Sequence, residues 1–398
     1  MTAAVIPPFS NHLPVRIRFG DGVAQELGAV VVGHRAATAI VMIDSELEER
    51  NRHVAASVRT LAQAGVEVAR FVKPEGEPTV DLVDAAAGAV LEAQPQAVVA
   101  IGGGSVIDTA KAARLCAGLG CTFGEFLASD RFVPEPAVPL IAVPTTAGTG
   151  SEVSGGAVIT DPTQARKSGI ASPLLRAQDA LVDPLLTHSV PRATTAFTGV
   201  DALAQAIAGM VARVRTPIGD AIALDAIRLI GRSLPVAHRS PGDAAARSEV
   251  ACGSLMAGLT MNISDCTAEH SLGQAIGGMF HVPHGLTIGL VLAQTLERER
   301  QYVAQQMERI ADVLGVPDDG SADGSRAVRG VRSLLAELEF PVLSSIGVEQ
   351  RHLAELTELA LADFFITQSP EPWTADEVRT AFASALAETE RPGCPAVG

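Results

Sequence analysis

The first 185 residues alternate short β-branched segments with longer segments of helical periodicity, and this alternation then stops. Four runs rich in β-branched or apolar residues predict strands, at residues 37–44, 66–72, 97–101 and 139–144, and the first is expected to be buried. Between the first two, residues 45–65 predict one amphipathic helix. Strands that alternate with helices need crossover connections, which produce a parallel sheet with helices on both faces. We therefore expect an α/β domain with a Rossmann-like parallel sheet over residues 1–185.

The strand pattern disappears after about residue 186. Segments rich in Ala and Leu take over, among them residues 217–239, 244–263 and 300–315, and their periodicity is that of helices. The acidic, Gly-rich segment 316–325 predicts a surface loop between helices. A chain of 398 residues is long enough for two domains, so we expect an all-helical domain over residues 186–398.

Charge and composition exclude several kinds of partner. The chain has 30 Lys and Arg against 45 Asp and Glu, a net charge of −15, which repels nucleic acids. Its five cysteines form no C-x-x-C pair, so we expect reduced thiols. The N-terminus lacks the pattern of a signal peptide, and His, Pro, Gln and Gly interrupt the longest uncharged stretch, residues 270–296. We expect a cytoplasmic protein with no membrane span.

A glycine-rich turn indicates a nucleotide site. Gly102, Gly103, Gly104 and Ser105 directly follow a predicted strand and begin a predicted helix. Glycines let the backbone approach a phosphate, and the helix N-terminus offers unpaired N–H groups and partial positive charge. The pattern is not G-x-G-x-x-G, and a purely structural turn is the alternative.

Two other segments end at the same predicted sheet edge. Asp44 closes the strand 37–44, where a carboxylate accepts hydrogen bonds from an adenosine ribose and repels a 2′-phosphate, which favours NAD over NADP. The alternative role for Asp44 is a helix N-cap. Residues 143–154 supply Thr, Ser and Gly after the strand 139–144, at the edge where α/β proteins bind ligands.

The helical half contains candidate metal ligands. If residues 198–212 form a helix, Asp201 and Gln205 lie one turn apart on one face. His270, His281 and His284 fall within fifteen residues, and histidine is the commonest transition-metal ligand. The break at "HVPHG" would let His270 and His284 face the same point as Asp201. An ordinary buried helix is the alternative.

Six motifs, in order, give the chain a specific resemblance: "RIRFGDG", "IGGGSVIDTAK", "PTTAGTGSEV", "ITDP", "DALAQAI" and "HVPHG". Over nearly its full length the chain resembles the iron-containing (group III) metal-dependent alcohol dehydrogenases, which have a dehydroquinate synthase-like fold. The resemblance implies a dinucleotide-binding domain, a helical domain and a catalytic metal between them. It also implies NAD(H)-dependent interconversion of a primary alcohol and an aldehyde, in a homodimer or larger assembly.

The resemblance assigns cofactor-binding roles to residues at the family's motif positions: Asp44, Gly102, Gly103, Gly104, Ser105, Asp108, Thr145, Thr146, Ser151 and Lys167. Lys167 resembles a lysine near the nicotinamide ribose, with a catalytic contribution, and a solvated surface lysine is its alternative. Asp108 and Lys111 also match family positions, and a salt bridge within one helix is their structural alternative.

The family's metal ligands are one Asp and three His, and this chain keeps Asp201, His270 and His284. Gln205 replaces the second ligand, and its amide oxygen binds Fe²⁺ or Zn²⁺ more weakly than imidazole does. Three protein ligands are enough for a catalytic site, so we expect a divalent metal with Gln205 as a weak or water-mediated ligand. His281 is the candidate proton relay, with a polar rim residue as its alternative.

Three other functions stay open on the sequence. One is a reductase without a tightly bound metal, in which His281 or His284 polarises the carbonyl. Another is an NAD-using lyase or synthase, which the scarcity of basic residues near the ligands disfavours. The third is a nucleotide-binding protein without turnover. Gln274, where many relatives have a histidine, joins Gln205 in favouring a polar aldehyde or hydroxy acid over a long alkyl alcohol.

Overall fold

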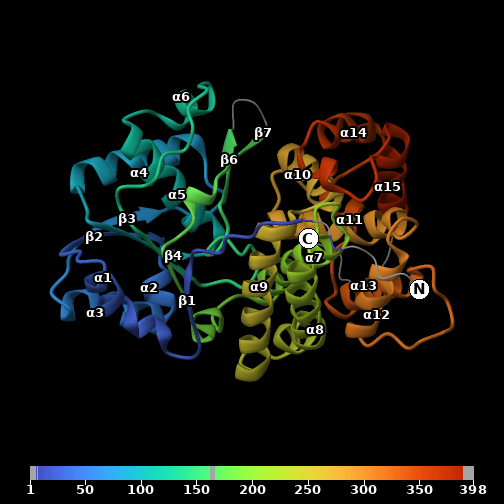
Figure 1. The fold of residues 1–398 in the computed structure, drawn as a ribbon, viewed down its shortest axis with the longest axis horizontal. Helices are drawn as coiled ribbons and strands as arrows, with labels where there is room; N and C mark the ends of the chain where they lie inside the picture. Colours follow the sequence, from blue (N-terminus) through green and yellow to red (C-terminus); the bar gives the residue numbers. More distant parts are fainter. Residues whose placement is uncertain (1–5, 7, 162–165, 389–398) are drawn as a thin grey trace.

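The computed structural model describes residues 6, 8–161 and 166–388, without the side chains of residues 166–168. Figure 1 shows the sheet and its helices on the left, and the helical part on the right. Within the described residues the last strand ends at Val182, and from Arg192 onward every regular element is a helix. The predicted fold, an α/β part followed by an all-helical part, is therefore confirmed.

A six-stranded parallel sheet forms the centre of the α/β part. Its strands, in spatial order, are β1 (Arg16–Phe19), β8 (Asp179–Val182), β5 (Leu140–Pro144), β4 (Ala97–Gly102), β2 (Thr38–Asp44) and β3 (Glu67–Lys73). The four predicted strands are present, as β2, β3, β4 and β5. The sequence did not predict β1 and β8, which are only four residues long, nor the antiparallel hairpin of β6 (Gly156–Asp161) and β7 (Arg166–Ala171).

Side chains of the central strands alternate between two helical layers. Ile40 and Met42 of β2 pack with α4 (Val80–Ala93) and α5 (Gly104–Leu119). Val41 and Ile43 pack on the opposite face, with α1 (Leu27–Gly33) and α3 (Arg52–Gln63). Because successive side chains in a strand point to opposite faces, a strand covered on both sides is apolar throughout.

The helix predicted over residues 45–65 is divided in two. Asn51 adopts an extended conformation (φ −131°) between α2 (Leu47–Arg50) and α3, and its Oδ1 accepts hydrogen bonds from the backbone N–H groups of His53 and Val54. Its Nδ2 donates to the Leu186 carbonyl. The single-helix prediction was wrong because an Asn that caps a helix has the same local pattern as one within it.

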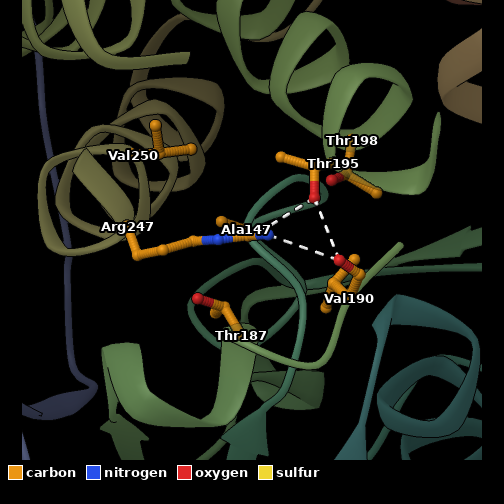
Figure 2. Close-up of a pocket in the computed structure, with 7 residues that line it drawn as sticks. All are labelled: Ala147, Thr187, Val190, Thr195, Thr198, Arg247 and Val250. Atoms are coloured by element: carbon orange, nitrogen blue, oxygen red, sulfur yellow. Dashed lines mark hydrogen bonds between the residues drawn. The ribbon is translucent and has the colours of Figure 1, made fainter. Parts of the chain in front are cut away.

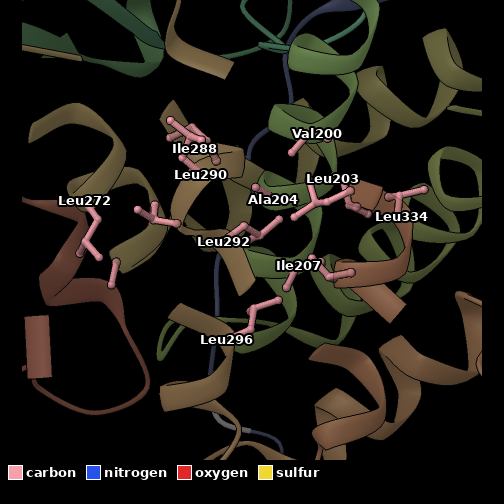
Figure 3. Close-up of a cluster of buried hydrophobic side chains, with 14 of the residues drawn as sticks. Val200, Leu203, Ala204, Ile207, Leu272, Ile288, Leu290, Leu292, Leu296 and Leu334 are labelled. Atoms are coloured by element: carbon pink, nitrogen blue, oxygen red, sulfur yellow. The ribbon is translucent and has the colours of Figure 1, made fainter. Parts of the chain in front are cut away.

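The helical part surrounds one large apolar core. Figure 3 shows side chains of α7 and α11, among them Leu203, Ile207 and Leu292, meeting in its interior. The remaining helices are α6 (Phe123–Leu127), in the α/β part, and α7 (Arg192–Val211), α8 (Pro217–Arg239), α9 (Ala244–Ser264), α10 (Ala268–Phe280), α11 (His284–Glu299), α12 (Ala304–Val313), α13 (Ser325–Glu337), α14 (Leu353–Leu361) and α15 (Ala375–Ala387). In the described chain, none of them is both long and apolar enough to cross a membrane.

Arg247 of α9 anchors the connection between the two parts. Its buried guanidinium donates to the Val190 carbonyl and to Thr195 Oγ1, as Figure 2 shows. Burial lowers the pKa of Arg247 from its usual value. These bonds hold the start of α7, the helix that carries Asp201, and the connection before it against α9.

Candidate active site

The carboxyl ends of three adjacent strands bring the predicted cofactor residues together. Ile43 of β2 pairs with Ile101 of β4, so Asp44 lies beside Gly102. Gly102 pairs with Pro144 of β5, and the Thr145 N–H donates to the Gly102 carbonyl. The helices that follow β2 and β4 cover opposite faces of the sheet, which makes this edge the kind of crevice where α/β proteins bind nucleotides.

Asp44 faces the glycine turn and does not cap the helix that follows. The N-cap residue of α2 is Glu46, while Asp44 Oδ2 lies 2.9 Å from where a Cβ atom at Gly102 would be. Asp44 Oδ1 lies 3.4 Å from the buried Lys73 ammonium. Burial raises the pKa of Asp44, and Lys73 offsets part of this increase.

The glycine turn is closed by the segment that follows β5. A Cβ atom at Gly104 would lie 2.6 Å from Thr149 Oγ1, so this close approach requires glycine. Thr146 Oγ1 is 3.3 Å from the corresponding position at Gly103, and Ser105 lies in the first turn of α5. Gly103 is the N-cap residue and has no side chain to accept the first N–H groups of α5. These N–H groups are suited to a phosphate.

A buried polar network joins α5 to the same segment. Ser151 Oγ donates to Asp108 at 2.5 Å and accepts from Lys111 Nζ at 2.8 Å. Lys111 also donates to the Gly156 carbonyl, and burial lowers its pKa to about 8. The predicted salt bridge within α5 is present too, with Lys111 Nζ 3.7 Å from Asp108 Oδ1.

Lys167 lies in β7 opposite Thr160, but its side chain is outside the described part of the structure.

Three predicted metal ligands from three helices converge in the helical part. Ligand atoms of Asp201 (α7), His270 (α10) and His284 (α11) all lie within 4.8 Å of one another. His270 Nε2 is 3.4 Å and His284 Nε2 is 3.8 Å from Asp201 Oδ1. Asp201 and His270 are buried, and His284 retains about a quarter of its side-chain exposure.

The break between α10 and α11 produces this convergence. His281 ends α10 in the left-handed region (φ +53°), and α11 begins at His284 after Pro283. Gly285 then lies against α7, because a Cβ atom there would be 2.3 Å from the Phe197 carbonyl oxygen. A larger residue at position 285 would force α11, and His284 with it, away from Asp201. His281 itself is exposed and stands outside the three-residue group.

The chemistry of the donor set suits a divalent cation. Among the described residues, no donor makes a hydrogen bond to Asp201 Oδ1 or to Gln205 Oε1, although both atoms are buried. Burial acts to raise the pKa of Asp201, but His284, His270 and Gln205 outweigh it and lower the pKa. An ionised carboxylate beside two imidazoles and an unsatisfied amide oxygen is a site that a metal would complete.

Gln205 connects the two halves of the site. Its Nε2 donates to the Thr149 carbonyl at 3.4 Å, and Thr149 is the residue that closes the glycine turn. Gln274 lies one turn after His270 on α10 and is partly buried. The metal group and the nucleotide edge are therefore adjacent, as hydride transfer between a cofactor and a substrate requires.

Three residues near His270 had no role in the sequence analysis. Glu269 Oε1 is 2.8 Å from His270 Nδ1, Cys266 belongs to a second group of possible ligand atoms with them, and the Phe365 ring packs edge-on to His270 at 5.8 Å. Cys266 and Glu269 precede His270 closely in the sequence, which was their only signal. Phe365 is distant in the sequence, so only the fold reveals it.

Comparison with known proteins gives matches along almost the whole chain. Residues 14–184 match the iron-containing alcohol dehydrogenase family model, and residues 195–386 match the model for the C-terminal part of the Fe-containing alcohol dehydrogenase family. The probable alcohol dehydrogenase EutG of Escherichia coli is 34% identical over 87% of this chain and 86% of its own. The NAD-dependent methanol dehydrogenase of Bacillus methanolicus is 30% identical over 97% and 100%.

A solved structure agrees with these matches. The sulfoacetaldehyde reductase of Bifidobacterium kashiwanohense, in complex with NAD⁺, superposes with a TM-score of 0.87 and 28% identity. The match covers 96% of this chain and 100% of that one. Sequence and fold lead to the same conclusion: the chain belongs to the iron-containing alcohol dehydrogenase family.

Proposed function

We propose that this protein is an NAD(H)-dependent oxidoreductase that interconverts a primary alcohol and an aldehyde with the help of a divalent metal, Fe²⁺ or Zn²⁺. Asp201, His270 and His284 would hold the metal, and Gln205 would contribute weakly or through water. The observation that carries the proposal is the buried pair of unsatisfied acceptors, Asp201 Oδ1 and Gln205 Oε1, beside two imidazoles. This group lies next to the nucleotide edge of the sheet.

Each part of the site has a separate task. A bound metal would act as a Lewis acid on the substrate oxygen, and the cofactor would carry the hydride. The glycine turn would hold the pyrophosphate, and Asp44 would accept hydrogen bonds from the adenosine ribose. Lys111 and Asp108 hold Ser151 in the segment that covers the turn. His281, exposed at the end of α10, would pass the proton between the substrate oxygen and solvent.

The substrate we propose is a small polar aldehyde or hydroxy compound. Gln205 and Gln274 add uncharged hydrogen-bonding groups next to the metal ligands, and a buried amide favours a substrate that satisfies it. A solved neighbour is a reductase of a polar aldehyde, sulfoacetaldehyde. We further propose a cytoplasmic homodimer or larger homo-oligomer, divided into domains near residue 185.

Steady-state kinetics on a matched set of aldehydes tests the proposal. Each polar aldehyde is paired with an alkyl aldehyde of the same chain length, and kcat/KM is measured with NADH. We expect turnover with NADH and a higher kcat/KM for the polar member of each pair. NADH binding without turnover of any aldehyde would contradict the oxidoreductase proposal. A preference for long alkyl chains would contradict only the substrate class.

A further inference from the structure

A second carboxylate contacts His270 through the ring nitrogen that faces away from Asp201. His270 Nε2 faces Asp201, while Nδ1 lies 2.8 Å from Glu269 Oε1. Both His270 and Glu269 are almost completely buried, at 3% and 1% exposure. A buried carboxylate is costly unless its oxygens are hydrogen-bonded, so its partners determine what it does here.

Glu269 is held as an acceptor by its own surroundings. The Thr267 N–H donates to Oε1 at 3.1 Å, and the Thr267 hydroxyl donates to Oε2. Glu269 also lies in the first turn of α10, where the partial positive charge of a helix N-terminus stabilises a carboxylate. Both carboxylate oxygens therefore accept hydrogen bonds from Thr267.

Because both Glu269 oxygens already accept hydrogen bonds from Thr267, the 2.8 Å contact with His270 Nδ1 determines which imidazole nitrogen carries the proton. His270 Nδ1 must carry a proton and donate it to Glu269. The lone pair that a metal ligand needs is then on Nε2, the atom that faces Asp201. Carboxylates placed in this way orient metal-binding histidines and make them more basic.

We propose that Glu269 is a positioning residue that holds His270 in the tautomer and orientation for metal binding, and so offsets the weaker ligand at Gln205. The inference rests on the proposed function, because it concerns the same metal. It would explain how a site with an amide in place of one imidazole still binds a metal.

Glu299 offers a matched control. It is completely buried at the end of α11, and no contact with His270 is found among the described residues. Burial raises the pKa of Glu299 above its usual range, and the nearby Glu269 carboxylate raises it further. Glu299→Gln therefore makes the same chemical change in the same helical interior, at a side chain away from His270.

Chelator competition measures the effect directly. The wild-type protein, Glu269→Gln, Glu299→Gln and Asp201→Asn are stripped of metal, and the Kd for Zn²⁺ is determined with a competing chromophoric chelator. Glu269→Gln keeps the size of the side chain and a carbonyl acceptor but loses the charge. We expect its Kd to rise about 10- to 100-fold, and the Kd of Glu299→Gln to stay within about twofold of wild type.

Thermal unfolding of the metal-free proteins separates positioning from folding. If Glu269 only held the fold together, metal-free Glu269→Gln would melt at a lower temperature than metal-free wild type. The proposal expects no decrease, since glutamine keeps the size of the side chain and an oxygen that can accept a hydrogen bond from Thr267. Glu269→Asp is the second variant: it keeps the charge but is one methylene too short for Nδ1, and its Kd should also rise.

The outcomes separate the two proposals. If Asp201→Asn binds Zn²⁺ as tightly as wild type, the proposed metal site is wrong, and this inference fails with it. If binding depends on Asp201 while Glu269→Gln keeps the wild-type Kd, only this inference is overturned. A second Zn²⁺ per chain that is lost in Cys266→Ser would also overturn it, because Glu269 would then be a ligand rather than a positioning residue.

Discussion

His270 Nε2 lies 3.4 Å from Asp201 Oδ1, longer than an ordinary N–H···O hydrogen bond, and both side chains are buried. The two groups come from different helices, α10 and α7, and His284 of α11 approaches the same oxygen at 3.8 Å. Two imidazoles around one unsatisfied carboxylate oxygen give this site its chemistry.

Asp201→Asn should abolish metal binding and most turnover. The amide removes the negative charge that balances a divalent cation. Substituting a residue that only supports a metal ligand already costs about 10- to 100-fold, so we expect kcat/KM to fall by more than about 100-fold when the ligand itself is replaced. Cofactor binding should persist, because Asp44 and the glycine turn are unchanged. NADH fluorescence titration and aldehyde reduction together check this prediction. A variant that retains turnover would show that Asp201 is not a ligand.

Gln205→His should tighten metal binding. An imidazole is a better ligand than an amide oxygen for Fe²⁺ or Zn²⁺, and position 205 lies one turn from Asp201 on α7. We expect the Zn²⁺ Kd to fall by about tenfold or more, measured by chelator competition. Gln205→Leu is the control, with a Kd no lower than that of wild type. An unchanged Kd in Gln205→His would mean that position 205 does not face the metal.

Asp44→Ser should shift cofactor preference toward NADPH. The substitution removes the carboxylate that would repel a 2′-phosphate and leaves the Lys73 ammonium nearby, formerly 3.4 Å from Asp44 Oδ1. We expect the ratio of kcat/KM for NADPH to that for NADH to rise at least about tenfold. The double variant Asp44→Ser, Lys73→Met should lose part of this gain. An unchanged ratio in Asp44→Ser would place the ribose elsewhere.

Asp179 should contribute a stabilising effect that is lost in acid. Burial acts to raise its pKa, but hydrogen bonds from Arg16, His34 and Arg18 outweigh it and lower the pKa to about 2. Because the folded pKa is below the unfolded value, the stabilisation is complete above about pH 4 and is lost as pH falls toward 2. Since the two arginines are partly exposed, we expect a contribution on the order of 1 kcal/mol.

Urea unfolding of Asp179→Asn across this pH range measures the effect. The free energy of unfolding of Asp179→Asn should be lower than that of wild type at pH 6, and this difference should shrink between pH 4 and pH 2. Glu26→Gln, which removes an exposed partner of Arg18, is the control and should show almost no difference at either pH. A difference that stays constant with pH would contradict the assigned pKa.

The predictable parts of the fold were those with a strong local pattern. The strand that ends at Asp44 and the helix of residues 217–239 have continuous apolar or periodic sequences, and the structure has them at almost the predicted bounds. The edge strand Arg16–Phe19 alternates charged and apolar residues over only four positions, which is too short a signal. The break at Asn51 depends on a contact with Leu186, which is distant in sequence.

The sequence likewise predicted only part of the candidate site. Asp201, His270 and His284 stood out because of their residue types and motifs. Glu269 did not, because its significance is a hydrogen bond through His270 Nδ1, and the direction of an imidazole ring depends on tertiary packing. Phe365 reaches His270 from a distant segment. The contacts that Glu269 and Phe365 make with His270 depend on how α10, α11 and the chain near residue 365 pack.

Metal analysis coupled to activity tests the central claim most directly. The wild-type protein is purified without chelator, its metal content is determined by mass spectrometry, and aldehyde reduction by NADH is measured before and after metal removal. The account predicts about one Fe²⁺ or Zn²⁺ per chain, loss of activity on removal and recovery when that metal is returned. Undiminished activity in the metal-free protein would contradict it.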